Sequence, residues 1–271
     1  MNKFITSALI TSLLTLTACS SSDEETDAAA KAASAAPAEQ LYNDARKMMD
    51  EGNYKDAVPA FEEVERQHPA SVWATNAQVM AAYASYKKNK YDEAVGMLER
   101  FVRLYPNHES TAYAYYLIAL CYYEQISDVG RDQKMTDLAM QALRDVVRRF
   151  PDTDYARDAA IKLDLTLDHL AGKEMQVGRY YLSRDNTLAA INRFRYVVEN
   201  YQTTSHVPEA LHRLVEAYTR LGVHEEAQRY AAVLGHNFPS SVWYRDSYKQ
   251  LTGDAPKPQA EADSGSSWLP W

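Results

Sequence analysis

The amino-acid sequence predicts an all-α fold, a solenoid built from five helical hairpins. Its 271 residues include only 9 glycines and 10 prolines, while alanine, leucine, glutamate and arginine are abundant, a balance that favours helix. One short phrase recurs after successive apolar segments, as RQHPAS, RLYPNH, RRFPDT and HNFPSS, and as NYQTTS without the proline. Because proline cannot continue a helix, each phrase predicts the end of one hairpin.

Apolar residues recur at fixed distances before each of these phrases. Counted back from the proline, or from Gln202 where the proline is missing, an alanine stands twelve residues earlier in every repeat: Ala57, Ala94, Ala139, Ala190 and Ala227. The residues eight positions earlier are Phe61, Leu98, Leu143, Phe194 and Ala231, and those five positions earlier are Val64, Phe101, Val146, Val197 and Leu234. This spacing of small, large and apolar residues resembles the second helix of a tetratricopeptide (TPR) repeat.

The first helix of each hairpin is predicted from a second set of small residues. Ala45, Ala82, Ala119, Gly178 and Val215 stand twelve residues before the later alanine, except in repeat three, where the gap is twenty. Val215 fits this pattern less well. Repeat three carries an insertion, ISDVGRDQK at 126–134, and YARDAAIKLDLTLDHLAGKEM at 155–175 predicts a lengthened helix before repeat four. Because one hairpin cannot bury its apolar face alone, the five are predicted to stack over residues 39–252.

Residues 1–18 predict a targeting segment that precedes the fold. Lys3 supplies a positive charge, and FITSALITSLLTLTA is an apolar stretch too short to span a membrane as a mature helix. It ends in LTAC, which resembles the lipobox of bacterial lipoproteins, and the resemblance implies that Cys19 is lipidated and becomes the new N-terminus. An ordinary signal peptide that ends near a cysteine is the alternative. In the lipoprotein pattern, Ser20 implies sorting to the outer membrane.

Two segments of low complexity flank the predicted solenoid. Residues 19–38 are predicted to form a flexible tether, because their small side chains cannot bury enough surface to order them. Residues 253–271 predict a disordered tail that contains SSWLPW. The two tryptophans of this tail predict a docking anchor, unless the tail folds back on the solenoid or has no role. The other cysteine, Cys121, lies within LIALCYY and is predicted to pack in the core.

No motif in the sequence predicts an active site. HExxH, GxSxG, Walker and CxxC patterns are absent, so we expect no enzyme, no metal site and no cofactor beyond the lipid on Cys19. Asp164, Asp168 and His169 share about one helical turn, where a solvated helix face is favoured over a metal site. The net charge of −8 argues against nucleic acid as a partner, because phosphate contacts require clustered lysine and arginine.

TPR solenoids bind partners on the concave face, which fixed positions of the first helices form. In repeats one to three the candidate groove residues are Tyr42, Arg46, Val79, Tyr83, Tyr86, Tyr113, Tyr116 and Tyr123. In repeats four and five they are Arg179, Glu209, His212, Glu216 and Arg220. Some of the tyrosines, about a third, are expected to pack between repeats instead, since buried aromatic rings are common core residues. The contrast predicts an aromatic surface for an extended peptide and a charged surface for a folded partner.

Taken together, these features resemble the BamD (ComL) family, outer-membrane lipoproteins of the β-barrel assembly (BAM) machinery of Gram-negative bacteria. The resemblance rests on the order of lipobox, tether, five repeats, a lengthened repeat three with GRDQ, and Tyr-Pro and Phe-Pro terminators. It implies a non-enzymatic scaffold, anchored by lipid at the periplasmic face of the outer membrane. The implied partners are the BamA POTRA domain nearest the barrel, bound by the C-terminal repeats, unfolded β-barrel proteins with a C-terminal aromatic signal, bound by the N-terminal repeats, and other BAM lipoproteins.

The resemblance also implies which cations face the partner. Arg193 in INRFR stands where relatives carry an Asn-Arg pair, and it is expected to face BamA together with Arg179 and Arg220. Gln202 and the WLPW tail depart from the family pattern. A TPR lipoprotein that organises peptidoglycan enzymes is the alternative function, and such a protein would lack the insertion in repeat three. A lytic transglycosylase would need a catalytic glutamate domain, for which no residues remain.

Overall fold

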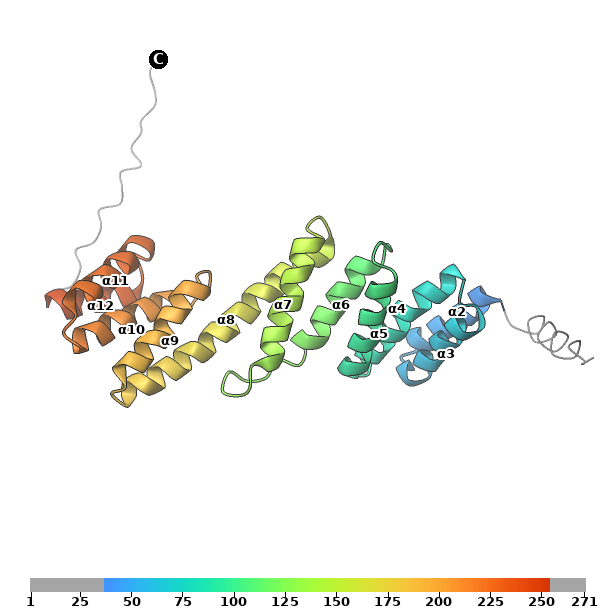
Figure 1. Ribbon diagram of the computed structural model, residues 1–271, viewed down its shortest axis with the longest axis horizontal. Helices are drawn as coiled ribbons and strands as arrows, with labels where there is room; N and C mark the ends of the chain where they lie inside the picture. Colours follow the sequence, from blue (N-terminus) through green and yellow to red (C-terminus); the bar gives the residue numbers. More distant parts are fainter. Residues whose placement is uncertain (1–36, 254–271) are drawn as a thin grey trace, which may run out of the picture.

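The computed structural model describes residues 37–253, and every regular element in that range is an α-helix (Figure 1). The first helices of the five hairpins are α2 (Ala38–Asp50), α4 (Val72–Lys87), α6 (Thr111–Tyr123), α8 (Asp154–Ser183) and α10 (Val207–Arg220). The second helices are α3 (Tyr54–Gln67), α5 (Tyr91–Leu104), α7 (Lys134–Arg149), α9 (Thr187–Asn200) and α11 (His224–Asn237), and α12 (Val242–Thr252) follows the last hairpin. The helices lie in an elongated row, and the predicted all-α TPR solenoid is confirmed.

The recurring phrases end the second helices in one common geometry. Each second helix stops two residues before the proline position, at Gln67, Leu104, Arg149, Asn200 and Asn237. The next residue has φ between −127° and −137°, and its N–H donates to the carbonyl four residues earlier. That carbonyl belongs to the apolar residue five positions before the proline. The same ending occurs before Gln202, so proline reinforces a stop that the fold also makes without it.

The residues that define the repeat form the core. All five alanines twelve positions before the proline are fully buried, as are the five apolar residues seven positions later. Of the residues between them, Phe61, Leu98, Leu143 and Phe194 are fully buried and Ala231 is partly exposed. Full burial of one large apolar side chain contributes about 1.5–3 kcal/mol. The repeating pattern therefore marks the side chains that hold the hairpins together.

The small residue on each first helix is matched to the large residue on its partner helix. A Cβ on Gly178 would lie 2.4 Å from the ring of Phe194, so only glycine leaves room for this phenylalanine. Repeat five reverses the sizes, with the buried Val215 on α10 and the small Ala231 on α11. The poor fit of Val215 to the sequence pattern therefore has a packing reason: the larger residue has moved to the other helix.

The long α8 joins the two halves of the row. It spans 30 residues, and its first turn is capped by Thr153, whose side chain accepts from the N–H of Ala156. Its first part packs on α7 and its second part is the first helix of repeat four, packed on α9. The lengthened helix expected from residues 155–175 is thus present, as a helix shared between two neighbouring hairpins.

The helix after the fifth hairpin, α12, was not predicted from the sequence. It packs on α10 and α11, where a Cβ on Gly235 of α11 would lie 2.5 Å from the ring of Tyr244. Ser241 caps α12 by accepting from the N–H of Trp243, and Ser71 caps α4 through the N–H of Trp73 in the same way. The helix covers the last hairpin in the position that a sixth repeat would occupy. Among the described residues, no helix is long and apolar enough to cross a membrane.

Candidate functional site

Two chemically different surfaces occupy the first helices, and the first is made of tyrosines. The aromatic cluster consists of Tyr83 and Tyr86 of α4, Tyr91 of α5, Tyr113 and Tyr116 of α6 and Tyr155 of α8. Ring centroids are 6.2 Å apart for Tyr83 and Tyr86, and 5.8 Å apart for Tyr86 and Tyr91. Tyr155 lies 5.4 Å from both Tyr113 and Tyr116. Tyr113 joins these two groups of rings, because it packs against the same buried cluster as Tyr83, Tyr86 and Tyr91, so four helices contribute to the aromatic surface.

Three hydroxyl groups of this cluster, those of Tyr86, Tyr113 and Tyr116, have raised pKa values and remain protonated. Burial raises the pKa of Tyr86 to about 12, and Glu124, which accepts a hydrogen bond from its hydroxyl at 3.2 Å, adds to the shift. Burial also raises the pKa of Tyr113 and of Tyr116, and the hydroxyl of Tyr116 donates to Asp158. The rings are consequently uncharged and partly buried, Glu124 and Asp158 hold two of their hydroxyls, and the ring faces suit the binding of aromatic or apolar side chains.

The predicted groove residues outside the cluster have different positions. Tyr42 and Val79 are only 8% and 4% exposed and pack in the core between helices, which removes them from the open groove. Arg46 is exposed on α2, and Tyr123 is half-buried below Lys162, whose ammonium lies 5.9 Å from the ring centroid. Tyr91 and Tyr155 were not predicted. Tyr155 lies at the start of α8 beside a terminator phrase, so its place relative to α6 depends on how the hairpins stack.

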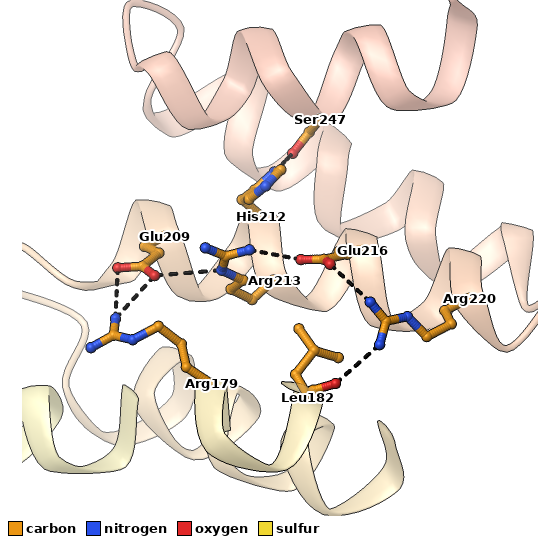
Figure 2. A network of polar contacts seen from close by, with 8 residues as sticks. All are labelled: Arg179, Leu182, Glu209, His212, Arg213, Glu216, Arg220 and Ser247. Carbon is orange, nitrogen blue, oxygen red and sulfur yellow. Dashed lines mark hydrogen bonds and ion pairs between the residues drawn. The ribbon is translucent and has the colours of Figure 1, made fainter. Parts of the chain in front are cut away.

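The second surface is a chain of charges that links α8 and α10 (Figure 2). This ion ladder consists of Arg179, Glu209, Arg213, Glu216 and Arg220, with alternating sign. Arg179 donates to both oxygens of Glu209 at 3.0 Å. Arg213 contacts Glu209 at 3.5 Å and Glu216 at 2.8 Å, and Arg220 donates to Glu216 at 3.2 Å. Each carboxylate is held between two guanidinium groups.

The ion ladder also fixes the C-terminal end of α8. Arg220 donates at 3.0 Å to the carbonyl of Leu182, one of the last carbonyls of α8, and lies 3.3 Å from Asp185. A cation at this position stabilises the negative end of a helix dipole. Arg179 and Arg220, both predicted to face a partner, are therefore engaged within the chain. Arg213 was not predicted as a site residue, although it lies four residues after Glu209 and three before Glu216, a spacing that predicts ion pairs on one helix face.

His212 lies beside the ion ladder and connects α10 to α12 (Figure 2). It is buried, its Nδ1 lies 2.8 Å from the Ser247 hydroxyl, and its ring centroid is 5.3 Å from that of Trp243. Burial lowers the pKa of His212, and the positive charge of Arg213 lowers it further. The histidine expected in the groove is instead a neutral packing contact for the last helix.

Arg193, the predicted partner-facing cation, lies on α9. It donates to Glu174 of α8 at 3.0 Å, and its side chain remains 44% exposed. An exposed pair of this kind contributes about 0–1 kcal/mol to stability. Arg193 therefore keeps a solvent-facing side through which a second carboxylate can approach.

The residues weighed as a metal site take part in helix contacts. Asp168 accepts from the N–H and the hydroxyl of Ser205 at 3.0 and 2.7 Å, and His169 lies 2.8 Å from the Ser127 carbonyl. Across residues 37–253, no group of three or more His, Cys, Asp or Glu is arranged to hold a metal ion. Cys121 is fully buried, as predicted, and burial raises the pKa of its thiol to about 12.

Comparisons with known proteins find relatives over most of the chain. The model of a family described as outer membrane lipoprotein (YfiO) matches residues 34–251. The outer membrane protein assembly factor BamD of Caulobacter vibrioides is 53% identical, over 83% of this chain and 74% of its own. The factor of the same name from Rickettsia prowazekii is 46% identical, over 90% of this chain and 94% of its own. A solved TPR protein of Thermus thermophilus aligns at 19% identity with a TM-score of 0.35, over 79% of this chain and 98% of its own.

Proposed function

The chain belongs to the outer membrane lipoprotein family of the assembly factor BamD, and from this premise we propose how its surfaces work. The protein is a non-catalytic scaffold of the BAM complex, anchored to the periplasmic face of the outer membrane by lipid on Cys19, which lies outside the described residues. Its N-terminal half captures unfolded β-barrel proteins. Its C-terminal half holds the POTRA domain of BamA, and other BAM lipoproteins share the assembly.

The observation that carries the proposal is the chemical division of the groove. The aromatic cluster spans α4, α5, α6 and the start of α8, while the ion ladder spans the end of α8 and α10. A scaffold for two unlike partners needs two unlike surfaces, and an enzyme would instead need reactive groups gathered in one pocket.

The aromatic cluster suits an extended chain with aromatic side chains. An amphipathic strand presents aromatic rings on one face, and each ring that packs on a tyrosine adds about 0.5–1.5 kcal/mol beyond its area burial. The hydroxyls of Tyr86 and Tyr116 already donate to Glu124 and Asp158, and their oxygens can still accept from the backbone N–H groups of an unpaired strand. This combination accepts many sequences, as capture of different barrel proteins requires.

The charged half suits a folded partner with a charged surface. Complementary charges set the orientation and the association rate of two folded domains more than their affinity. Because the ion ladder is satisfied internally, it holds repeats four and five rigid, and Arg193 on the neighbouring helix offers the open side of a half-exposed pair. We therefore assign first contact with BamA to Arg193 and a supporting role to Arg179 and Arg220.

Affinity purification of the lipidated protein from membranes tests the proposal. The expected result is recovery of a barrel protein with POTRA domains, together with other lipoproteins. A second purification with Tyr83→Ala/Tyr86→Ala should retain that barrel protein and lose unfolded client chains. Recovery of peptidoglycan enzymes in place of the POTRA protein would contradict the proposal and favour the adaptor alternative.

A further inference from the structure

Two adjoining hollows lie on α8, between the aromatic cluster and the ion ladder. The first, of about 410 Å³, is bounded by Tyr123, Ile126 and Thr166, and the second, of about 400 Å³, by Asp168, Gln176, Arg179 and His206. Leu165 and His169 line both, so the two form one continuous depression, here called the central groove. Hollows of this size are typical of sites that hold one or two large side chains.

The central groove is preformed by contacts that fix its rim. His169 lies 2.8 Å from the Ser127 carbonyl, and Lys173 donates to the carbonyl of Gly130 at 3.3 Å, so the inserted loop is tied to α8 at two points. At Gly172 a Cβ would lie 3.2 Å from the His206 ring, which shows how closely the start of α10 approaches α8. A rigid rim lowers the entropy cost of binding.

The apolar part of this groove is exposed. Leu165 is 57% exposed, and Ile161, one turn earlier on the same face of α8, is 65% exposed. Ile161 lies just outside the lining, and the second hollow adds polar groups further along α8: the carboxylate of Asp168, the amide of Gln176 and the guanidinium of Arg179. Two tryptophans suit the two ends of this groove: near Leu165 an indole ring can pack on an apolar side chain, near Arg179 its face can attract a guanidinium, and each indole N–H needs an acceptor.

We propose that the segment Trp268–Leu269–Pro270–Trp271 of the same chain docks in the central groove. The segment lies outside the described residues, and its sequence supplies two indoles three positions apart. Pro270 favours an extended backbone at Leu269, so the two rings lie about 9–10 Å apart along the chain. The centres of the two hollows are offset by about one to two turns of α8, or about 5–10 Å. Each hollow thus receives one indole.

The connector is long enough for docking within one molecule. Residues 253–267 form a stretch of 15 residues whose root-mean-square span is about 19–23 Å. The last described helix, α12, packs on α10, which the Arg179–Glu209 pair ties to α8. Fully extended, the connector covers up to about 50 Å, which is enough to pass from α12 over α10 and along α8 to both hollows.

The connector meets charges of both signs at the central groove. The connector carries Asp254, Glu261 and Asp263 against the single Lys257, so it is acidic. Among the residues that line the groove, Arg179 is cationic and Glu124 and Asp168 are anionic, and Lys173 lies beside the lining on α8. A tethered segment is held at an effective concentration in the millimolar range, so even a weak contact is well populated. Any separate chain that uses the central groove must first displace this segment.

A competition experiment on the full-length chain tests the docking. A fluorescein-labelled peptide of residues 254–271 is titrated with the wild-type chain and with the Trp268→Ala/Trp271→Ala variant, and anisotropy is recorded. The peptide should bind the variant at least about ten-fold more tightly, because the tethered competitor is gone. Adding Leu165→Glu to the variant should weaken binding about ten-fold or more, while Leu188→Glu, at an equally exposed leucine on α9, should leave it unchanged.

Three outcomes would overturn the proposal. The first is equal peptide affinity for the wild-type chain and the tryptophan variant, and the second is binding that survives Leu165→Glu. The third is a dimer in sedimentation that the tryptophan variant abolishes, since the occupant would then be the tail of a second copy. Circular dichroism checks that each variant is folded, and Leu165→Ser replaces Leu165→Glu if the charge unfolds the chain.

Discussion

The N-terminal and C-terminal halves of this solenoid use equivalent positions for opposite chemistry. The residue directly after the small residue of the first helix is Tyr83 in repeat two and Arg179 in repeat four. The residue six positions before the small residue is Tyr113 in repeat three and Glu209 in repeat five. In one half these positions pack ring on ring, and in the other they pair charge with charge.

This difference shows that the repeat determines the backbone and leaves the concave positions free to vary. The alanine twelve positions and the apolar residue five positions before each terminator position recur in both halves, and all of them are buried. Function therefore resides in residues that contribute little to the fold, as is general for sites carried on a common scaffold. The comparison also predicts different physical behaviour, because ring packing is insensitive to salt whereas exposed ion pairs are screened.

The largest expected effect tests whether repeats four and five follow the same rule for packing a small residue against a large one. Phe194→Ala should lower the free energy of unfolding by about 3–5 kcal/mol, because it leaves a cavity next to Gly178. Gly178→Val should also destabilise, by about 1–3 kcal/mol through overpacking. The double variant recreates the Val215–Ala231 pair of repeat five and should cost less than the sum of the two.

Urea unfolding of the four proteins measures this coupling. Gly96→Val serves as the control, since a Cβ on this helical glycine would meet nothing within 4 Å. Strict additivity of the two changes in repeat four would mean that the size exchange between repeats is coincidental. A large cost for Gly96→Val would mean that a β-branched side chain is costly on these helices even without contact with Phe194, since valine has a better helix propensity than glycine.

The next effect concerns binding at the aromatic cluster. Tyr83→Ala/Tyr86→Ala should weaken capture of a peptide with an aromatic C-terminus by roughly 1–3 kcal/mol, because two stacked rings are lost. Binding of BamA at the other end should persist. A fluorescence titration measures capture, and Tyr180→Ala, at an exposed tyrosine of α8 outside the cluster, is the matched control. If both binding activities fail together with a large fall in Tm, these tyrosines act as core residues.

Sequence reasoning succeeded where one hairpin determines its own structure. The offsets of alanine, large residue and proline lie within a single hairpin, so they predicted the second helices, their ends and the lengthened helix before repeat four. The size exchange between Gly178 with Phe194 and Val215 with Ala231 obeys the same local rule, although the sequence pattern alone made Val215 a poor match.

The rest depends on contacts between hairpins, which no local pattern encodes. Tyr42 was assigned to the groove, but it packs 5.0 Å from Trp73 of the next repeat, measured between ring centroids. Tyr155 joins the aromatic cluster only because α8 stacks beside α6. The helix α12 was not predicted for the same reason. No terminator phrase follows it, and it is stabilised by packing on α10 and α11. The sequence therefore predicted which helix carries each site residue, but it did not predict which residues of the neighbouring hairpins they contact.

A smaller effect concerns the pH dependence of folding stability, which we expect to arise at His212 in the C-terminal half. His212 is buried with a lowered pKa, so as the pH falls below about 6.5 the unfolded chain takes up a proton that the folded chain resists. Stability is therefore highest above this pH and falls as the pH drops towards 5. The charged groups nearest the imidazole are Arg213, Glu216 and Glu209 on α10 and Asp246 on α12, with Arg213 acting against the proton.

Thermal melts at pH 7.5, 6.5 and 5.5 measure this dependence, with His212→Asn as the comparison. The variant keeps a donor for Ser247 and loses the ionisable ring, so its Tm should fall less on acidification. His224→Asn, at an exposed histidine that starts α11, is the control and should follow the wild type. If the Tm of His212→Asn falls on acidification as steeply as that of the wild type, His212 is not the source of the pH dependence.

The smallest effect on stability is expected at Arg193, and it carries the sharpest test of the charged half. Arg193→Glu breaks a half-exposed pair with Glu174 and should change the free energy of unfolding by about 0–1 kcal/mol. Against an acidic surface of BamA, the same change introduces a repulsion of about several kcal/mol, so co-purification should be lost although the fold is intact. Arg195→Glu is the matched control: Arg195 lies on the same helix, is similarly exposed and pairs with Glu199 at 3.5 Å.

Because the two positions differ by about 200° around the helix, only one of them can face a given partner. Equal loss of BamA with both variants would indicate a general charge effect, and undiminished binding with Arg193→Glu would move the contact elsewhere on the C-terminal half.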